Sequence, residues 1–161
     1  MSNNPYKTRE GGATVTVFVP YDCNNHCPFC INKKEYADCT GFSLDAILES
    51  IRTMDAITPR CDFVFTGGEP LANLESLQKM LDVIPTTHKV YINTTFPVQT
   101  GFYTAEEMLD FTRRNRDKIT CINVSRHLQR YVEESPDEVV AAIATPKRIN
   151  CVLYKIGRAH V

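Results

Sequence analysis

The fold of this chain is constrained most by a regular alternation of two kinds of segment along its sequence. Five short runs rich in β-branched and apolar residues occur at 13–19, 62–66, 89–93, 120–125 and 149–154. Four segments with apolar residues at helical spacing lie between them, at about 43–51, 73–84, 104–117 and 135–145. Strands that alternate with helices predict an α/β fold with a parallel sheet and right-handed crossovers. Both a doubly wound sheet and part of a barrel satisfy this pattern.

Each helical segment begins with a residue type that pairs the free backbone N–H groups of a helix N-terminus. Thr104 and Glu107 have the spacing of a capping box, in which each side chain bonds the backbone of the other. Pro136 suits the first helical position, because its missing N–H would be unpaired there in any case. The expected caps are Ser43, Asn73, Thr104 with Glu107, and Ser135 with Glu138.

The composition is that of one ordinary globular domain. The chain has 161 residues, 43% of them hydrophobic and 23% charged, which argues against disorder. Its 18 basic and 19 acidic side chains leave a net charge of −1, so no broad basic field is expected for nucleic acid or an anionic membrane. No apolar run reaches the roughly 20 residues that cross a bilayer. Residues 1–12 lack the apolar region of a signal peptide, so a cytoplasmic location is expected, where disulfides are rare.

Three of the seven cysteines lie close together, directly after the first predicted strand. Cys23, Cys27 and Cys30 have the spacing Cys-x3-Cys-x2-Cys. Three thiolates at such spacing repel one another unless a metal centre neutralises them. Because iron–sulfur clusters generally take four cysteine ligands, a local trio predicts a cluster with one iron left open. A zinc site completed by His26 or Cys39, and an inert loop, are alternatives that the spacing leaves open.

Small or polar residues also follow three further predicted strands. Gly67-Gly68-Glu69-Pro70 follows the second strand, residues 93–95 end the third, and Ser125-Arg126 ends the fourth. The carboxyl ends of parallel strands share one edge of a sheet, where ligands bind in α/β folds. The sequence therefore predicts one site at this edge. An ordinary turn at 67–70 and an ordinary strand end at 125–126 are the alternatives. For residues 93–95 the sequence favours a polar loop over a ligand site.

These elements, in this order, resemble the radical S-adenosylmethionine (SAM) enzymes. The resemblance covers residues 13–155 and includes Phe29 before the last cysteine of the motif, residues 67–70, which look like the family's GGEP motif, and residues 123–126. It implies a partial (β/α)6 barrel similar to a TIM barrel, with about five strands present and the last part missing.

The resemblance also implies a role for each residue of the predicted site. Cys23, Cys27 and Cys30 would hold a [4Fe-4S] cluster whose fourth iron is chelated by SAM. The implied SAM contacts are Phe29 near the adenine, Gly67, Gly68, Glu69 and Pro70 around the methionine part, Ser125 at the ribose and Arg126 at the carboxylate. Either the carboxylate or the backbone of Glu69 would meet the SAM ammonium group.

The chemistry that the resemblance implies is reductive cleavage of SAM to methionine and a 5′-deoxyadenosyl radical, which abstracts hydrogen from a substrate. It further implies a one-electron donor similar to flavodoxin or ferredoxin, and a substrate that is a small molecule or a peptide. The alternative is a zinc- or iron–sulfur-binding module without catalysis. Such a module would use the same three cysteines but would need neither residues 67–70 nor residues 125–126.

The chain divides into three expected parts. Residues 1–12 form a polar lead-in, residues 13–155 form the incomplete core, and residues 156–161 (IGRAHV) are expected to be a non-native tail. A sheet without its sixth strand would leave the fifth strand as an open edge, which promotes aggregation. Cys61, Cys121 and Cys151 are expected to be buried as small hydrophobic residues, whereas Cys39 lies in a loop.

Overall fold

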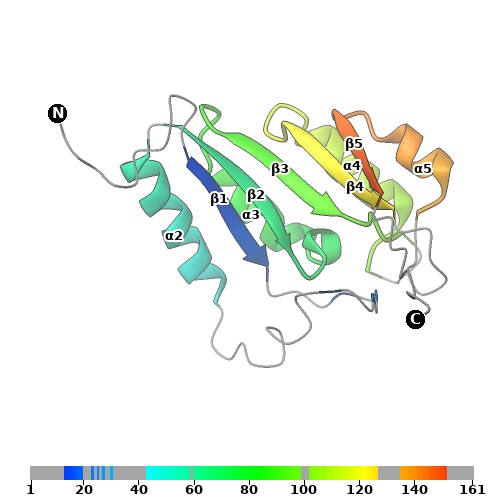
Figure 1. The fold of residues 1–161 in the computed structure, drawn as a ribbon, viewed down its shortest axis with the longest axis horizontal. Helices are drawn as coiled ribbons and strands as arrows, with labels where there is room; N and C mark the ends of the chain where they lie inside the picture. Colours follow the sequence, from blue (N-terminus) through cyan, green and yellow to red (C-terminus); the bar gives the residue numbers. More distant parts are fainter. Residues whose placement is uncertain are drawn as a thin grey trace, which may run out of the picture.

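A parallel β-sheet forms the centre of the molecule. The computed structural model describes residues 13–19, 23, 25, 27, 30, 43–58, 60–98, 102–126 and 135–151. Within these ranges the sheet has five strands in the order β1-β2-β3-β4-β5 (Figure 1). They are β1 (Ala13–Val19), β2 (Cys61–Gly67), β3 (Lys89–Thr94), β4 (Cys121–Arg126) and β5 (Lys147–Cys151). All four neighbouring pairs are parallel, which confirms the predicted parallel sheet.

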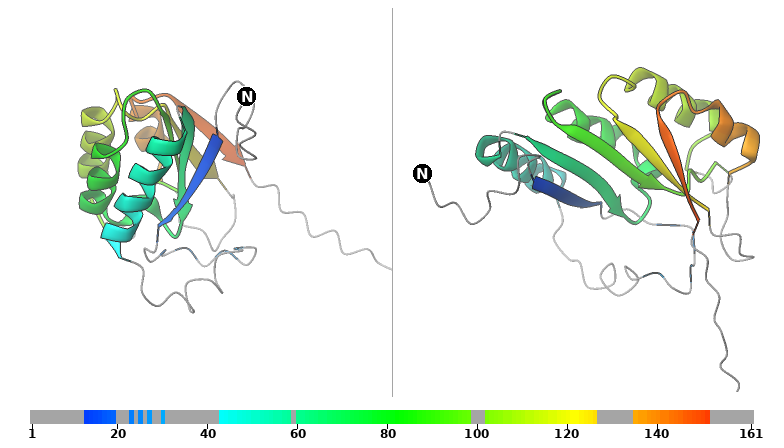
Figure 2. Two further views of the ribbon diagram at one scale, coloured as in Figure 1. Left: turned by 90° about the vertical axis from the view of Figure 1, so that its left-hand side faces the viewer. Right: turned by 45° about the horizontal axis from the view of Figure 1, so that its top comes forward.

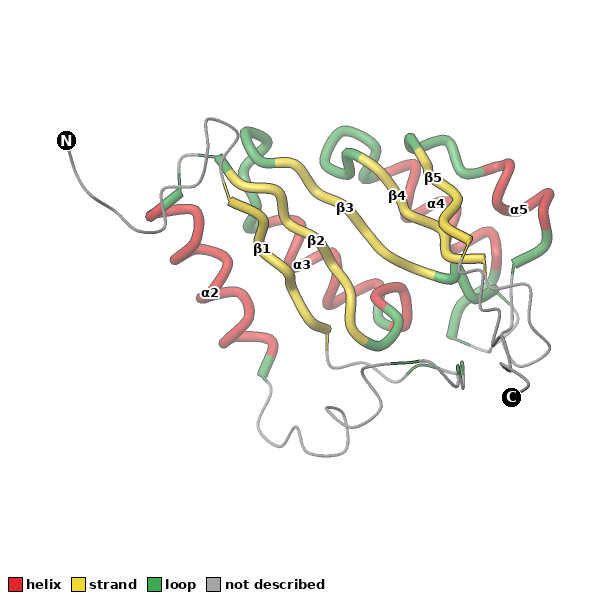
Figure 3. Tube along the Cα trace, in the orientation of Figure 1, coloured by secondary structure: helices red, strands yellow, loops and turns green. Residues whose placement is uncertain are grey.

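The described helices lie on one face of this sheet. They are α2 (Leu44–Ile57), the short 3-10 helix η1 (Pro70–Ala72), α3 (Leu74–Asp82), α4 (Ala105–Arg114) and α5 (Asp137–Ala142). Figure 2 shows them on the same side of the strands, and Figure 3 shows strands and helices in alternation. A doubly wound sheet reverses its strand order and carries helices on both faces. That alternative is excluded, and the sequential strand order is that of a partial barrel wall.

Three of the four predicted caps are confirmed. Ser43 Oγ and Asn73 Oδ1 each accept a hydrogen bond from the backbone N–H three residues further on, at 3.1 and 2.9 Å. Thr104 and Glu107 form the complete capping box at the start of α4. Each cap pairs a backbone N–H that the helix cannot pair itself, so these local patterns define where α2, α3 and α4 begin.

The start of α5 differs from the prediction. The helix begins at Asp137, with Pro136 at the cap position in an extended conformation, so Ser135 lies one residue too early to cap it. Ser135 Oγ is buried and has no hydrogen-bond partner among the described residues. The helix ends at Ala142 rather than near residue 145, because Ile143 is already extended.

The two faces of the sheet differ in chemistry because side chains alternate along each strand. Under the helices the strands contribute buried apolar side chains, namely Val17, Val19, Phe63, Phe65, Val90, Ile92, Ile122 and Val124. The opposite side, here called the open face, carries Thr66, Tyr91, Asn93, Asn123 and Ser125. Branched apolar residues commonly fill the interior of a closed barrel. The open face instead offers hydroxyl and amide groups, which suits a polar ligand better than a packed core.

The cysteines outside the predicted cluster motif differ in exposure. Cys61 and Cys121 are buried, as expected. Cys151 is exposed at the end of β5, so its predicted burial is wrong; this strand is at the edge of the described sheet and all five of its residues are exposed. Cys39 and residues 156–161 lie outside the described residues. In the described ranges, no helix has the length and apolar character needed to cross a membrane.

A buried histidine joins the start of β2 to α2. His88 Nδ1 accepts a 3.0 Å hydrogen bond from the backbone N–H of Cys61, and His88 Nε2 lies 2.8 Å from Asp55 Oδ1. A ring nitrogen that accepts from an N–H carries no proton, so Nε2 carries it and donates to Asp55. The ring also meets Phe63 edge-on, with 5.4 Å between ring centroids. This contact stabilises the amino-terminal end of the sheet.

Replacing His88 should therefore destabilise the fold more than replacing Asp55. His88→Ala leaves the buried N–H of Cys61 without an acceptor and opens a cavity, which should lower the free energy of unfolding by about 2–4 kcal/mol. Asp55→Asn keeps an oxygen to accept from Nε2 at a partly exposed position, so the loss should stay below about 1 kcal/mol. Urea unfolding measures both values. Equal losses would contradict the larger contribution assigned to the buried contacts of His88.

Candidate functional site

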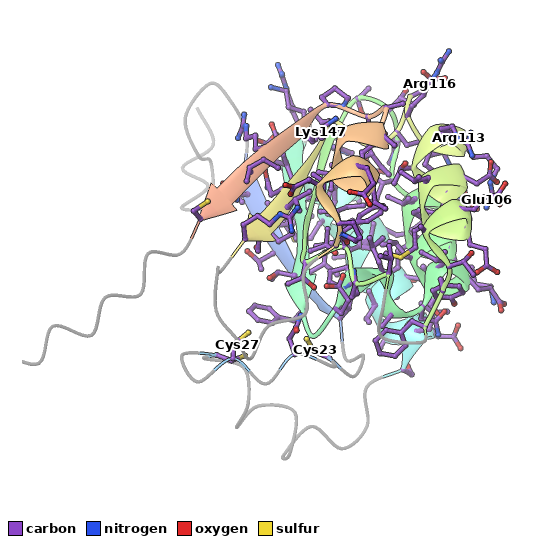
Figure 4. The ribbon with its side chains drawn as sticks, turned by 90° about the vertical axis from the view of Figure 1, so that its right-hand side faces the viewer. Cys23, Cys27, Glu106, Arg113, Arg116 and Lys147 are labelled. Atoms are coloured by element: carbon purple, nitrogen blue, oxygen red, sulfur yellow. The ribbon has the colours of Figure 1, made fainter. Side chains whose placement is uncertain are left out.

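The described residues of the predicted site follow the carboxyl ends of the strands. Cys23, Cys27 and Cys30 follow β1, and Figure 4 shows Cys23 and Cys27 at the end of the sheet opposite Lys147, the first residue of β5. Cys27 is buried, whereas Cys23 and Cys30 are partly exposed. The backbone N–H of Cys30 donates to the carbonyl oxygen of Cys27 at 3.1 Å. Phe29 lies outside the described residues.

The electrostatics around Cys23 disfavour a free thiolate. Burial is the main cause that raises the pKa of Cys23 to about 11, and the nearby Glu69, Cys27 and Cys30 raise it further. A hydrogen bond from the backbone N–H of Asn25 opposes the shift. Three thiolates beside a carboxylate therefore need a strongly cationic partner. Iron ions bridged in a cluster meet this requirement, so the donor set fits a [4Fe-4S] group.

A single metal ion is a different case. Among the residues that the structure describes, no three His, Cys, Asp or Glu side chains are grouped so as to hold a metal ion. Cysteines that hold an iron–sulfur cluster bind different iron atoms, so their sulfur atoms lie further apart than the ligands of a single ion. Ligation by the three cysteines remains a prediction.

Four hydrogen bonds hold the Glu69 side chain in the site. It is 2% exposed, and each carboxylate oxygen accepts two hydrogen bonds. Oε1 accepts from the Leu71 N–H at 3.0 Å and from the Thr94 hydroxyl at 2.5 Å. Oε2 accepts from both the N–H and the hydroxyl of Thr95, each at 3.1 Å. Burial raises the pKa of Glu69, while these four donors act against that shift.

This arrangement narrows the predicted role of Glu69. Its carboxylate has two oxygens with about four acceptor positions in all, and four donors already occupy them. Of the two ways in which Glu69 is expected to meet an ammonium group, the structure favours the backbone over the carboxylate.

The Gly67-Gly68 turn requires glycine and touches the end of β1. Gly67 has a φ of 116°, which glycine adopts readily because it has no Cβ. The N–H of Gly68 donates to the carbonyl oxygen of Val19 at 3.3 Å, so the turn lies beside the end of β1. The segment that carries Cys23, Cys27 and Cys30, here called the cysteine loop, follows this strand. Pro70 is buried and starts η1. The turn thus presents backbone rather than side chains next to the carboxyl end of β1.

Ser125 and Arg126 lie at the end of β4 but point in different directions. Ser125 is partly exposed on the open face, opposite Asn150 of β5. Arg126 turns toward α5: its Nη1 donates to the Ser135 carbonyl oxygen and its Nη2 to Asp137 Oδ1, both at 2.6 Å. The structure therefore joins the cysteine loop, residues 67–70 and the end of β3, whereas Arg126 primarily ties β4 to α5. SAM contacts from Ser125 and Arg126 remain predictions.

Sequence reasoning missed the residue that links these parts. Asn25, between the first two cysteines, is buried, and its Nδ2 donates to Thr95 Oγ at 3.0 Å. Thr94 and Thr95, for which the sequence favours a polar loop over a pocket, are buried and hold Glu69. Glu69 could have indicated the role of these threonines from the sequence. A buried carboxylate requires hydrogen-bond donors, and hydroxyl groups at the end of the next strand can supply them.

In the metal-free protein, Cys23 should react with iodoacetamide only at high pH. A thiol with a pKa of about 11 is roughly 0.1% thiolate at pH 8, and this fraction rises with pH. The alkylation rate of Cys23 should therefore rise about tenfold per pH unit between pH 8 and 10, as peptide mass spectrometry can follow. A short unstructured cysteine peptide, with a thiol pKa near 8.5, should level off within this range. Parallel profiles would contradict the raised pKa.

Known proteins share both the sequence family and the fold. Residues 10–140 match the family described as 4Fe-4S single cluster domain. No curated protein sequence matches the chain. Among solved structures, native anSMEcpe with bound AdoMet and Cp18Cys peptide has a TM-score of 0.62 and 16% identity, covering 86% of this chain and 42% of that chain. Native anSMEcpe with bound AdoMet and Kp18Cys peptide has a TM-score of 0.62 and 19% identity, with 86% and 43% covered.

A third structure, histidine-tagged anSMEcpe with bound AdoMet, has a TM-score of 0.62 and 18% identity, and covers 86% of this chain and 43% of that chain. The chain thus spans less than half the length of these structures. At this low identity, the TM-scores show a shared fold and no more. The family match covers most of the chain, and its description agrees with the expected [4Fe-4S] cofactor. The chain belongs to the 4Fe-4S single cluster domain family.

Proposed function

We propose that this protein is a radical SAM enzyme that binds AdoMet beside a [4Fe-4S] cluster and abstracts hydrogen from a substrate. The observation that carries the proposal is the hydrogen-bonded junction of the cysteine loop, the Gly67-Gly68 turn and the end of β3 at one edge of the sheet. Support also comes from the family match and from the fold shared with structures that contain AdoMet. When bound and reduced, the cluster supplies the electron that cleaves AdoMet to methionine and a 5′-deoxyadenosyl radical.

The chain's own residues bind and orient the cofactors. Cys23, Cys27 and Cys30 would hold the cluster. Gly67 and Gly68 would let their backbone approach the amino end of AdoMet, because no side chain stands in the way. The hydroxyl of Ser125 would meet the ribose. Arg126 would contribute to the carboxylate contact from the end of β4, and Phe29 would lie near the adenine.

The open face is the proposed binding surface for the substrate. Asn93 Oδ1 accepts a 2.8 Å hydrogen bond from Asn123 Nδ2, and the Arg148 guanidinium carbon lies 6.0 Å from the centre of the Tyr91 ring. Such amide, aromatic and cationic groups bind polar substrates, whether a small molecule or a peptide. Two of the similar structures contain a peptide. A one-electron donor of the flavodoxin or ferredoxin type would reduce the cluster.

Anaerobic reconstitution with iron and sulfide tests the proposal. After dithionite reduction the protein should show the electron paramagnetic resonance signal of a [4Fe-4S]⁺ cluster, and added AdoMet should yield 5′-deoxyadenosine and methionine in equal amounts. Separate Cys23→Ser, Cys27→Ser and Cys30→Ser variants should form no 5′-deoxyadenosine, because each lacks a cluster ligand.

Cys121→Ser provides the matched control, since Cys121 begins β4 and so lies at the amino-terminal edge of the sheet, opposite the edge at which the cysteine loop follows β1. It should yield as much 5′-deoxyadenosine as the unchanged protein. A reconstituted cluster that leaves AdoMet intact would overturn the proposal in favour of a non-catalytic iron–sulfur module. Zinc bound in place of the cluster would favour a zinc module.

A further inference from the structure

We propose that Asn25 and Thr95 are positioning residues that tie the cysteine loop to the buried Glu69 carboxylate; this inference rests on the proposed function. Asn25 Nδ2 donates to Thr95 Oγ at 3.0 Å, and the Thr95 hydroxyl donates to Glu69 Oε2 at 3.1 Å. All three side chains are buried, with 9, 9 and 2% exposed. This relay joins the segment between two cluster ligands to the turn proposed to bind AdoMet.

The direction of the relay is determined by Glu69. A hydroxyl has one proton to donate, and the Thr95 hydroxyl gives it to Glu69 Oε2. Its oxygen is therefore turned toward Asn25 as an acceptor. Hydrogen bonds that run in one direction to a buried negative charge polarise one another and become stronger.

Glutamine could not take the place of Glu69. Each carboxylate oxygen faces a backbone N–H, that of Leu71 on one side and that of Thr95 on the other. Whichever way a glutamine amide turned, its NH2 group would face one of these fixed donors. The site therefore requires a group that accepts on both sides, which a carboxylate does.

Thr94 provides a matched comparison for Thr95. Both hydroxyls donate to Glu69, so each contributes one hydrogen bond to the same carboxylate. The Thr94 oxygen accepts from the N–H of Phe96, two residues away, at 2.8 Å. The Thr95 oxygen accepts from Asn25, 70 positions away. Of these two threonines, Thr95 is the one that connects Glu69 to Asn25 among the described residues.

The relay has a specific consequence for the cluster. Asn25 lies between Cys23 and Cys27, and its own backbone N–H bonds the Cys23 sulfur. A tether on the Asn25 side chain therefore restrains the first ligand directly. Because Glu69 follows the Gly67-Gly68 turn, the same tether sets the position of the cluster relative to that turn.

Thr95→Val and Thr94→Val test this inference. Each variant keeps the shape of the side chain and removes one hydroxyl, so both should lower the thermal stability of the metal-free protein to a similar extent. Only Thr95→Val should release iron faster to a chelator from the reconstituted protein, by about five- to tenfold for one lost hydrogen bond. Thr94→Val should stay within about twofold of the unchanged protein. Thr95→Ser should restore the slow release, because it keeps the hydroxyl.

The metal-free protein gives a second readout. At a fixed pH of 9, Thr95→Val should speed the alkylation of Cys23 by iodoacetamide relative to Thr94→Val, since the loop is no longer held against β3. In turnover with AdoMet, Thr95→Val should raise KM more than it lowers kcat, and Thr95→Ser should reverse the change. If Thr95→Val does not fold, Asn25→Ala removes the donor from the loop side without altering the sheet, and should release iron equally fast.

Equal behaviour of Thr95→Val and Thr94→Val in iron release and in Cys23 alkylation would overturn the inference, as would failure of Thr95→Ser to restore slow release. Failure of the proposed function has a different signature. A protein that yields no 5′-deoxyadenosine contradicts the radical SAM activity, while the alkylation comparison still tests the relay.

Discussion

The buried carboxylate of Glu69 is the interaction on which the carboxyl edge of the sheet depends. A charge removed from water requires compensation by donors at fixed positions. These donors come from η1 and from the end of β3, two segments that meet only when β2 and β3 are correctly paired. The turn after β3 is part of the same hydrogen-bond network. Phe96 has a φ of 55°, which is uncommon for an aromatic residue. Its N–H donates to the hydroxyl oxygen of Thr94, which itself donates to Glu69.

Because side chains alternate along each strand, one face of the sheet packs in the core and the other is left for binding. One set of strand residues packs beneath α2, α3, α4 and α5, and the other set forms the open face. The groups proposed for cofactors follow the ends of the strands, so they are held by a rigid wall without being part of its packed core. The open face can therefore be polar although the core is apolar, because the two lie on opposite sides of one sheet.

Local patterns in the sequence predict the elements well, because strand alternation and helix caps such as Ser43 and Asn73 depend on neighbours within a few positions. Contacts over long distances are not encoded in this way. The bond from Asn25 to Thr95 and the turn of Arg126 toward Asp137 depend on where whole elements pack. Cys151 is exposed because β5 lies at the edge of the described sheet, whereas its place in an apolar strand pattern suggested burial.

The strand pairing also has a consequence for the order of folding. Ala13 of β1 and its partner Cys61 are 48 positions apart, whereas the first pairs of the other neighbouring strands are 27, 30 and 25 positions apart. The entropy cost of closing a loop grows with its length, and distant contacts form slowly. Pairing of β1 is therefore the costliest closure in the described sheet. The Asn25–Thr95 bond spans 70 positions and joins the segment after β1 to the end of β3, so the contact between the cysteine loop and the rest of the site depends on this closure.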